Sequence, residues 1–165
     1  MGLRQAAADS AGAKRGRTLK ARELLSKAYA LDRSSQEHEA IPLYEAALRG
    51  RLRREDRIDA MICLASSYRV VGNVDEGLRW LKACVREAPN DGVVVLFQAL
   101  MCLDRGDAMR GLTLLANALL DGVDTRRVAA YRPALRRYFR SAARTAARRS
   151  APARGDPCTV QARPR

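Results

Sequence analysis

LASSYRVVGNVDEGLRWLKACVREAPND, residues 64–91, decides the fold of this chain of 165 residues. The stretch has small residues where two neighbouring helices would cross, and it ends on Pro-Asn-Asp, which stops a helix. Parts of this stretch recur at a constant offset. The number of residues from Gly72 to Gly106 is the same as that from Gly77 to Gly111. This offset is the period of about 34 residues that is typical of stacked pairs of helices. The sequence therefore predicts a repeat protein in which each pair of helices packs against the next.

Apolar residues at helical spacing predict further helices on both sides of this stretch. The run VVVLFQALMCLDRG, residues 93–106, is apolar nearly all round, which indicates a buried helix. No segment alternates between apolar and polar residues with the period of a strand, so the fold is predicted to be all-α. The helices are expected at 21–32, 38–49, 55–70, 74–87, 93–106, 109–122 and 124–140.

Residues with capping chemistry mark two helix starts. Asn73 and Glu76 have the spacing of a capping box, and Asp91 is placed to cap the helix that follows it. Gly77 lies inside an expected helix, where glycine costs about 1 kcal/mol relative to alanine. We interpret Gly77 as a small residue that lets two helices cross closely at Ala65.

The positive charge of the chain is concentrated at its two ends. The formal net charge is +13, yet residues 21–140 contribute only +4 of it, with both signs interspersed. Residues 1–20 and 141–165 contribute the rest, and they are rich in Ala, Arg, Gly, Pro and Ser without an apolar period. Such a composition predicts that both end segments are disordered. Any contact with nucleic acid is therefore expected from these tails.

No residue pattern indicates an enzyme, a cofactor or a metal centre. The single histidine, His38, has no Cys or Ser motif near it, and the carboxylates are spread along helices as solvated charges. There is no glycine-rich phosphate loop and no metalloprotease motif. Cys63, Cys84 and Cys102 fall inside expected helices without a Cys-x-x-Cys pair, so we interpret them as small buried apolar residues. Cys158 is expected to be an exposed thiol in the tail.

Membrane attachment and export are not indicated either. No stretch reaches the ~20 consecutive apolar residues that a membrane span requires. The first residues also lack the apolar core of a secretory signal. We therefore expect a soluble cytoplasmic protein.

Three runs of sequence, HEAIPLYEAAL (38–48), SSYRVVGNVDEGLRWLKACVREAPND (66–91) and YRPALRRYF (131–139), together resemble the group-5 tetratricopeptide-repeat (TPR) proteins of bacteria. The resemblance covers residues 21–140 and is best in the middle unit, although Met61 stands there in place of the usual Trp. It implies a solenoid, a right-handed superhelix of about three TPR helix-turn-helix repeats with a C-terminal capping helix. The implied boundaries are 21–52, 58–91 and 92–122 for the repeats and 124–140 for the capping helix.

In this family the first helix of each pair lines the concave side, where peptide partners usually lie. The leucines of residues 93–106 are expected to be covered by the closing helix. An aromatic side chain with two guanidinium groups, as in Tyr29, Arg33 and Arg69, would suit an acidic or carboxylate-bearing peptide. The resemblance places these partner-binding candidates on the concave side: Arg22, Leu25, Tyr29, Arg33, Ile62, Ser66, Arg69 and Val70.

Two functions are consistent with this architecture. The leading hypothesis is a non-catalytic protein–protein interaction module, or scaffold, that binds a segment of a partner on its concave face. The alternative is a basic accessory protein whose Arg-rich tails contact RNA or DNA phosphates. Salt dependence separates the two, because phosphate-driven binding weakens steeply with ionic strength. The oligomeric state is left open by the sequence.

Overall fold

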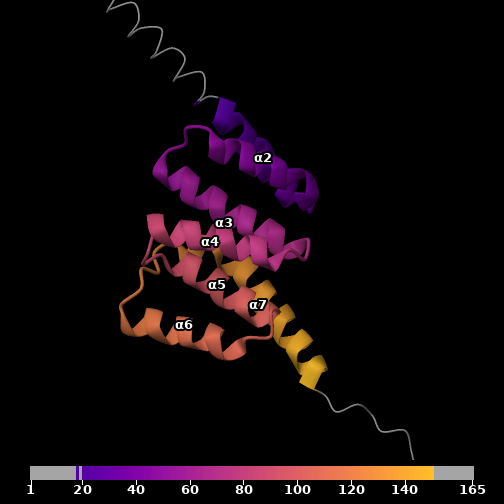
Figure 1. Cartoon of the computed structure of the whole chain (residues 1–165), viewed down its shortest axis with the longest axis vertical. Helices are drawn as coiled ribbons and strands as arrows, with labels where there is room; N and C mark the ends of the chain where they lie inside the picture. Colours follow the sequence, from indigo (N-terminus) through magenta and orange to yellow (C-terminus); the bar gives the residue numbers. More distant parts are fainter. Residues whose placement is uncertain (1–17, 19, 151–165) are drawn as a thin grey trace, which may run out of the picture.

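The computed structural model describes residue 18 and residues 20–150, and its helices up to α6 are stacked in chain order along the long axis of the molecule, with α7 beside the stack (Figure 1). The predicted all-α architecture is confirmed, since three sequential pairs of helices are followed by a closing helix. The helices are residues 20–33, α2 (Glu37–Arg49), α3 (Arg54–Val70), α4 (Val74–Glu87), α5 (Gly92–Asp104), α6 (Ala108–Leu120) and α7 (Val128–Ser150).

Neighbouring helices pack closely because small residues lie where they cross. α3 packs on α4 and α5 packs on α6, while α2 with α3 and α4 with α5 join one pair to the next. A Cβ atom on Gly77 would lie 2.8 Å from the carbonyl oxygen of Ala65, and one on Gly111 would lie 3.1 Å from that of Ala99. The helix backbones therefore approach each other at the predicted crossing, and again at its counterpart in the next repeat.

Gly77→Ala is expected to lower the free energy of unfolding by up to about 2 kcal/mol. Overpacking costs about 1–3 kcal/mol, and the gain in helix propensity returns only about 1 kcal/mol. Gly111→Ala is the matched control, because its Cβ has slightly more room, and it should change stability by less than about 0.5 kcal/mol. Urea denaturation of both variants measures the difference. A Gly77→Ala variant more stable than wild type would contradict the close crossing.

Glycines and a side-chain cap form the turns between helices. Gly72, Gly106 and Gly122 have φ angles of +86°, +81° and +71°, a left-handed conformation that glycine adopts at no steric cost. The Asn73 side chain accepts a hydrogen bond from the backbone N–H of Glu76 (3.3 Å). The capping role predicted for Asn73 is therefore confirmed.

The closing helix is longer than the sequence predicts. α7 continues to Ser150 instead of ending at residue 140, so residues 141–150 are helical and not part of a disordered tail. Their sequence, SAARTAARRS, is made largely of Ala and Arg, which are strong helix formers, and the next proline comes only at position 152. Thr18 and Lys20, in the predicted N-terminal tail, are helical as well. The other residues of the predicted disordered tails, 1–17, 19 and 151–165, lie outside the described residues.

Three of the cysteines take part in the packing of the stack. Cys84 and Cys102 are buried and Cys63 is half-buried, as their interpretation as apolar residues requires, while Cys158 lies outside the described residues. Burial raises the pKa of the Cys63 and Cys84 thiols to about 12, so both remain uncharged at neutral pH. Within the described chain, no helix combines the length and the apolarity needed to cross a bilayer.

Candidate partner-binding face

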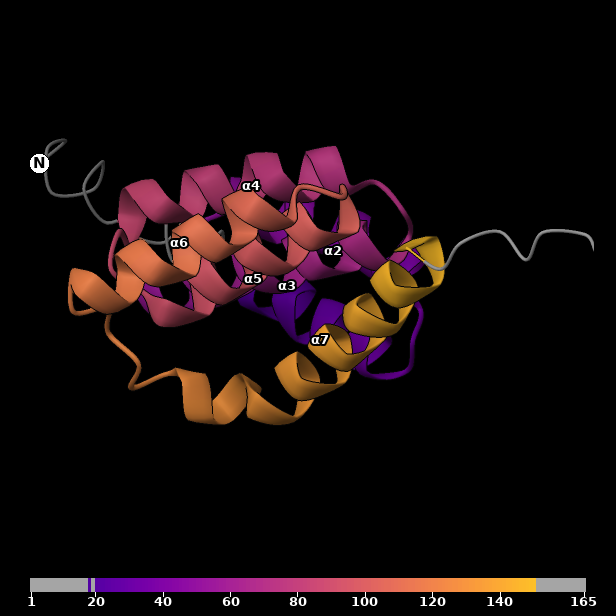
Figure 2. The same ribbon diagram turned by 90° about the horizontal axis from the view of Figure 1, so that it is seen from below.

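α7 covers the inner side of α3 and α5, the side that faces away from α4 and α6. Figure 2 shows α4 and α6 on one side of α3 and α5, and α7 on the other. The ring of Phe97 in α5 packs edge to face on two rings of α7, with centroids 6.1 Å from Tyr131 and 6.3 Å from Tyr138. Leu135, between these two tyrosines in sequence, is buried. The closing helix therefore packs on the fifth helix. Of the leucines predicted to be covered, Leu100 is buried, and Leu96 and Leu103 are partly buried.

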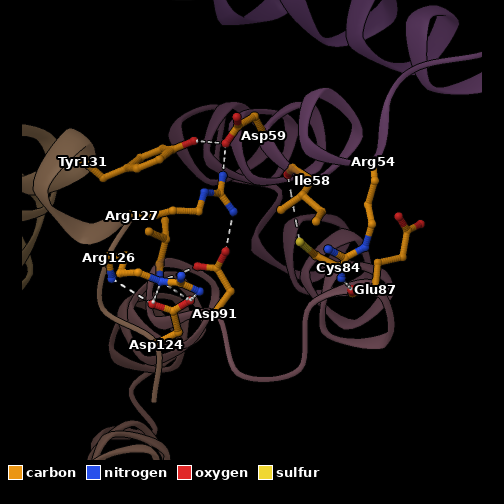
Figure 3. A network of polar contacts seen from close by, with 11 residues as sticks. Arg54, Ile58, Asp59, Cys84, Glu87, Asp91, Asp124, Arg126, Arg127 and Tyr131 are labelled. Carbon is orange, nitrogen blue, oxygen red and sulfur yellow. Dashed lines mark hydrogen bonds and ion pairs between the residues drawn. The ribbon is translucent and has the colours of Figure 1, made fainter. Parts of the chain in front are cut away.

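A cluster of ion pairs and hydrogen bonds, here called the Arg127 clasp, fixes the start of α7 (Figure 3). Arg127 pairs with Asp59 of α3 and with Asp91 at the start of α5. The Tyr131 hydroxyl donates a hydrogen bond to the same Asp59 carboxylate (2.7 Å). Burial raises the pKa of Tyr131, so this hydroxyl stays protonated and remains a donor. The four residues of the clasp thus join α3, α5 and α7.

Arg69 holds α7 from the other end of α3. Its guanidinium is paired with the Asp104 carboxylate of α5 and lies over the ring of Tyr138, 4.9 Å from the centroid, in a cation–π arrangement. The Arg69 side chain is only 12% exposed. Because Tyr131 contacts Asp59 in the first half of α3 and Tyr138 contacts Arg69 near its end, α7 runs in the same general direction as α3. Arg69 is therefore a link between three helices.

Three of the eight candidate residues are buried. Leu25, Ile62 and Ser66 are 5%, 0% and 8% exposed. The prediction that these residues contact a partner assumes that the whole inner side is exposed to solvent. In the structure the neighbouring helices cover these positions, and α7 covers the inner side of α3. Leu25 and Ile62 belong to the apolar core. In this structure the three residues are therefore not available for direct contact with a partner.

The remaining candidates lie closer to solvent. Arg22, Arg33 and Val70 are exposed. Tyr29 is half-buried, and its ring packs edge to face on Tyr44, with centroids 5.5 Å apart. Given about 3.6 residues per helical turn, Arg22, Tyr29 and Arg33 lie on one side of the first helix. The structure thus brings two exposed guanidiniums and one aromatic ring to the same side of residues 20–33.

Asp32, a partly buried carboxylate at the end of the same helix, is not among the residues predicted from the sequence. The Ser67 hydroxyl donates a hydrogen bond to its Oδ1 (3.0 Å) and the Tyr44 hydroxyl donates one to its Oδ2 (3.3 Å). Burial raises the pKa of the Asp32 carboxyl, and these two hydrogen bonds partly offset that effect. Its partner Ser67 belongs to the next repeat, so no local pattern indicates the contact.

Asp32→Asn is expected to change how stability depends on pH. Because the pKa of Asp32 is raised in the folded state above its ordinary value of 3.8, the folded chain binds the proton more tightly. The Asp32 carboxyl therefore contributes a loss of stability as pH rises from about 4 through its folded pKa, and this contribution is absent from the variant. Urea denaturation at several pH values should show the variant gaining on wild type as pH increases. A difference that is the same at every pH would contradict the raised pKa.

The outer side of α7 carries a stripe of exposed arginines. An arginine occurs at every fourth residue, so these side chains lie along one slowly winding row of the helix. It extends for about 24 Å, at about 1.5 Å per residue. The sequence predicts basic contacts from disordered tails, whereas α7 presents these side chains in an ordered helical array. The members of the stripe are Arg132, Arg136, Arg140, Arg144 and Arg148.

Comparison with known proteins gives one result for this chain. A family model described as Tetratrico peptide repeat (TPR_5) matches residues 21–147. Neither the curated proteins nor the solved structures gave a match.

Among the residues that the structure describes, no group of three or more His, Cys, Asp or Glu side chains could hold a metal ion.

Proposed function

We propose that this chain, which belongs to the tetratricopeptide-repeat family, is a non-catalytic interaction module that binds a segment of a partner protein on the exposed part of its concave face. TPR domains are typically protein-interaction modules. The observation that carries the proposal is the exposure of Arg22, Arg33 and Val70. These residues stay accessible although α7 covers the inner side of α3 and α5.

The chemistry of this surface suits an acidic segment. Arg22 and Arg33 are separated by about 16 Å along the helix, at about 1.5 Å per residue. An extended peptide rises about 3.3 Å per residue, so carboxylates about five residues apart could pair with both guanidiniums. Tyr29 lies between them in sequence and offers an apolar ring to the peptide. Guanidinium–carboxylate pairs are among the stronger hydrogen-bonded contacts, which favours a partner segment rich in Asp or Glu.

Arg22→Glu combined with Arg33→Glu is expected to reduce capture of the partner about tenfold or more, which corresponds to about 1.4 kcal/mol. Lys20→Glu combined with Lys27→Glu is the matched control, because it reverses two exposed charges on the other side of the same helix. Affinity capture with the tagged full chain, quantified by mass spectrometry, compares both variants with wild type. Equal loss in both variants would indicate a general charge effect and would overturn the proposed face, as would retention of the partner in both.

A second candidate function rests on the arginine stripe of α7. Its regular spacing on an ordered helix favours contact with a polyanion, and it supports the alternative of RNA or DNA binding more directly than tails alone. In the same set of variants, binding of a labelled RNA would survive Arg22→Glu with Arg33→Glu. It would also weaken steeply with added salt, because released counterions drive such binding. A protein partner held by the concave face would instead be lost from the variant Arg22→Glu with Arg33→Glu.

A further inference from the structure

α6 presents an apolar side that no part of the described chain covers. Among the described helices, α6 packs only on α5, and Figure 1 shows it at the end of the stack. Five large apolar side chains are exposed among the described residues, and four of them belong to α6. Their exposed fractions are 72% for Met109, 60% for Leu112, 75% for Leu119 and 84% for Leu120.

The spacing on this side of α6 is that of a helix–helix seam. Met109, Leu112, Ala116 and Leu119 follow one another at intervals of three, four and three residues, which is the a/d pattern of a coiled coil. The side carries no charge in a chain whose net charge is +13, and Arg110 lies on the opposite side of the helix. The exposed residues of this side are Ala108, Met109, Leu112, Thr113, Ala116, Leu119 and Leu120.

The preceding repeat shows what such a side normally contacts. Leu78 and Val85 of α4 are the counterparts, one repeat earlier, of Leu112 and Leu119. They are partly buried against the core, and α5 packs on their helix. After α6 the described residues supply no such helix, since α7 packs on the other side of α5 (Figure 2). The last repeat therefore has a side suited to another helix, and the described chain leaves it without one.

We infer that α6 of a second copy of this chain occupies this side, in an antiparallel α6–α6 pair. The seam is self-complementary in that arrangement, because Met109 lies opposite Leu119 and Leu112 lies opposite the small Ala116. Antiparallel helices also place their dipoles favourably. Since the side is uncharged, pairing requires no desolvation of a charge. The inference is independent of the proposed function, because it uses no residue of the concave face.

The oligomeric state of the full-length chain tests this pairing. Sedimentation velocity from about 1 to about 200 μM should show a monomer–dimer equilibrium that moves toward the dimer as concentration rises. Met109→Glu with Leu119→Glu, and Met109→Lys with Leu119→Lys, should each weaken the dimer about tenfold or more, because like charges would then face each other across the seam. Asn117→Glu adds a charge at an exposed position outside the seam, about 120° from the centre of the seam around the helix, and should leave the dimer unchanged.

Mixing the two charged variants gives a positive result that misfolding cannot imitate. The acidic and the basic variant, each monomeric alone, should form a dimer when combined in equal amounts, because opposite charges then meet across the seam. Circular dichroism confirms beforehand that both keep the helix content of wild type. A wild type that stays monomeric over the whole range would overturn the inference. So would charged variants that dimerise as well as wild type, or a mixture that does not associate.

Discussion

Phe97→Ala is expected to lower the free energy of unfolding by about 3–5 kcal/mol, the range typical for truncating a buried phenylalanine. Phe97 is 2% exposed, and its ring contacts Tyr131 and Tyr138 of α7. The substitution would leave a cavity and remove two aromatic pairs, each worth about 0.5–1.5 kcal/mol beyond burial. Since a domain is stable by only about 5–15 kcal/mol, much of the stability would be lost.

Phe139→Ala is the matched control for this prediction, because Phe139 lies in α7 and is only partly buried. Its truncation should cost about 1 kcal/mol. Urea denaturation followed by circular dichroism gives both values, and hydrogen exchange of the α7 amides shows whether α7 opens separately. If the two variants lost equal stability, Phe97 would not be the main apolar contact between α5 and α7.

The stack of helices is predictable from the sequence because its contacts are local and periodic. The constant offset that relates Gly77 to Gly111 identifies two helix crossings, and the structure shows close backbone approach at both. The nearly uniform apolarity of residues 93–106 indicates burial on more than one side, and α5 does lie between α6 and α7. Repeats of this kind contact mainly their neighbours, so a local pattern determines most of the core.

The candidate face is less predictable, because α7 contributes contacts that span long distances in sequence. Arg127 pairs with Asp59, which lies 68 residues earlier, and no periodic pattern relates the two. The apolar side of α7 indicates that this helix packs on the last repeat, but not which side of α5 it covers. The side that α7 covers decides whether Ile62 and Arg69 can contact a partner. In the structure Ile62 lies in the core, and Arg69 is paired with Asp104 and Tyr138.

Asp91→Ala is expected to lower the free energy of unfolding by about 3 kcal/mol, because Asp91 makes two separate contacts. Its Oδ1 accepts a hydrogen bond from the backbone N–H of Val93 (2.9 Å) as the N-cap of α5, as the sequence predicts, and such caps contribute about 1 kcal/mol. Its Oδ2 pairs with Arg127, and a hydrogen bond to a charged group contributes about 1.5–3 kcal/mol. The Asp91 side chain is only 9% exposed, so water replaces little of what is lost.

Asp107→Ala separates these two contributions, since Asp107 caps α6 through the backbone N–H of Arg110 (3.1 Å) and is exposed. Its loss should cost only about 1 kcal/mol, and the excess cost of Asp91→Ala, measured by urea denaturation, belongs to the clasp. In an Arg127→Ala background that excess should disappear, because a double-mutant cycle removes the shared contact. Equal costs for the two aspartates in the wild-type background would mean that the Arg127 pair adds no stability. α7 would then be held on α5 by apolar contacts such as that of Phe97, and its position over the inner face would depend on packing alone.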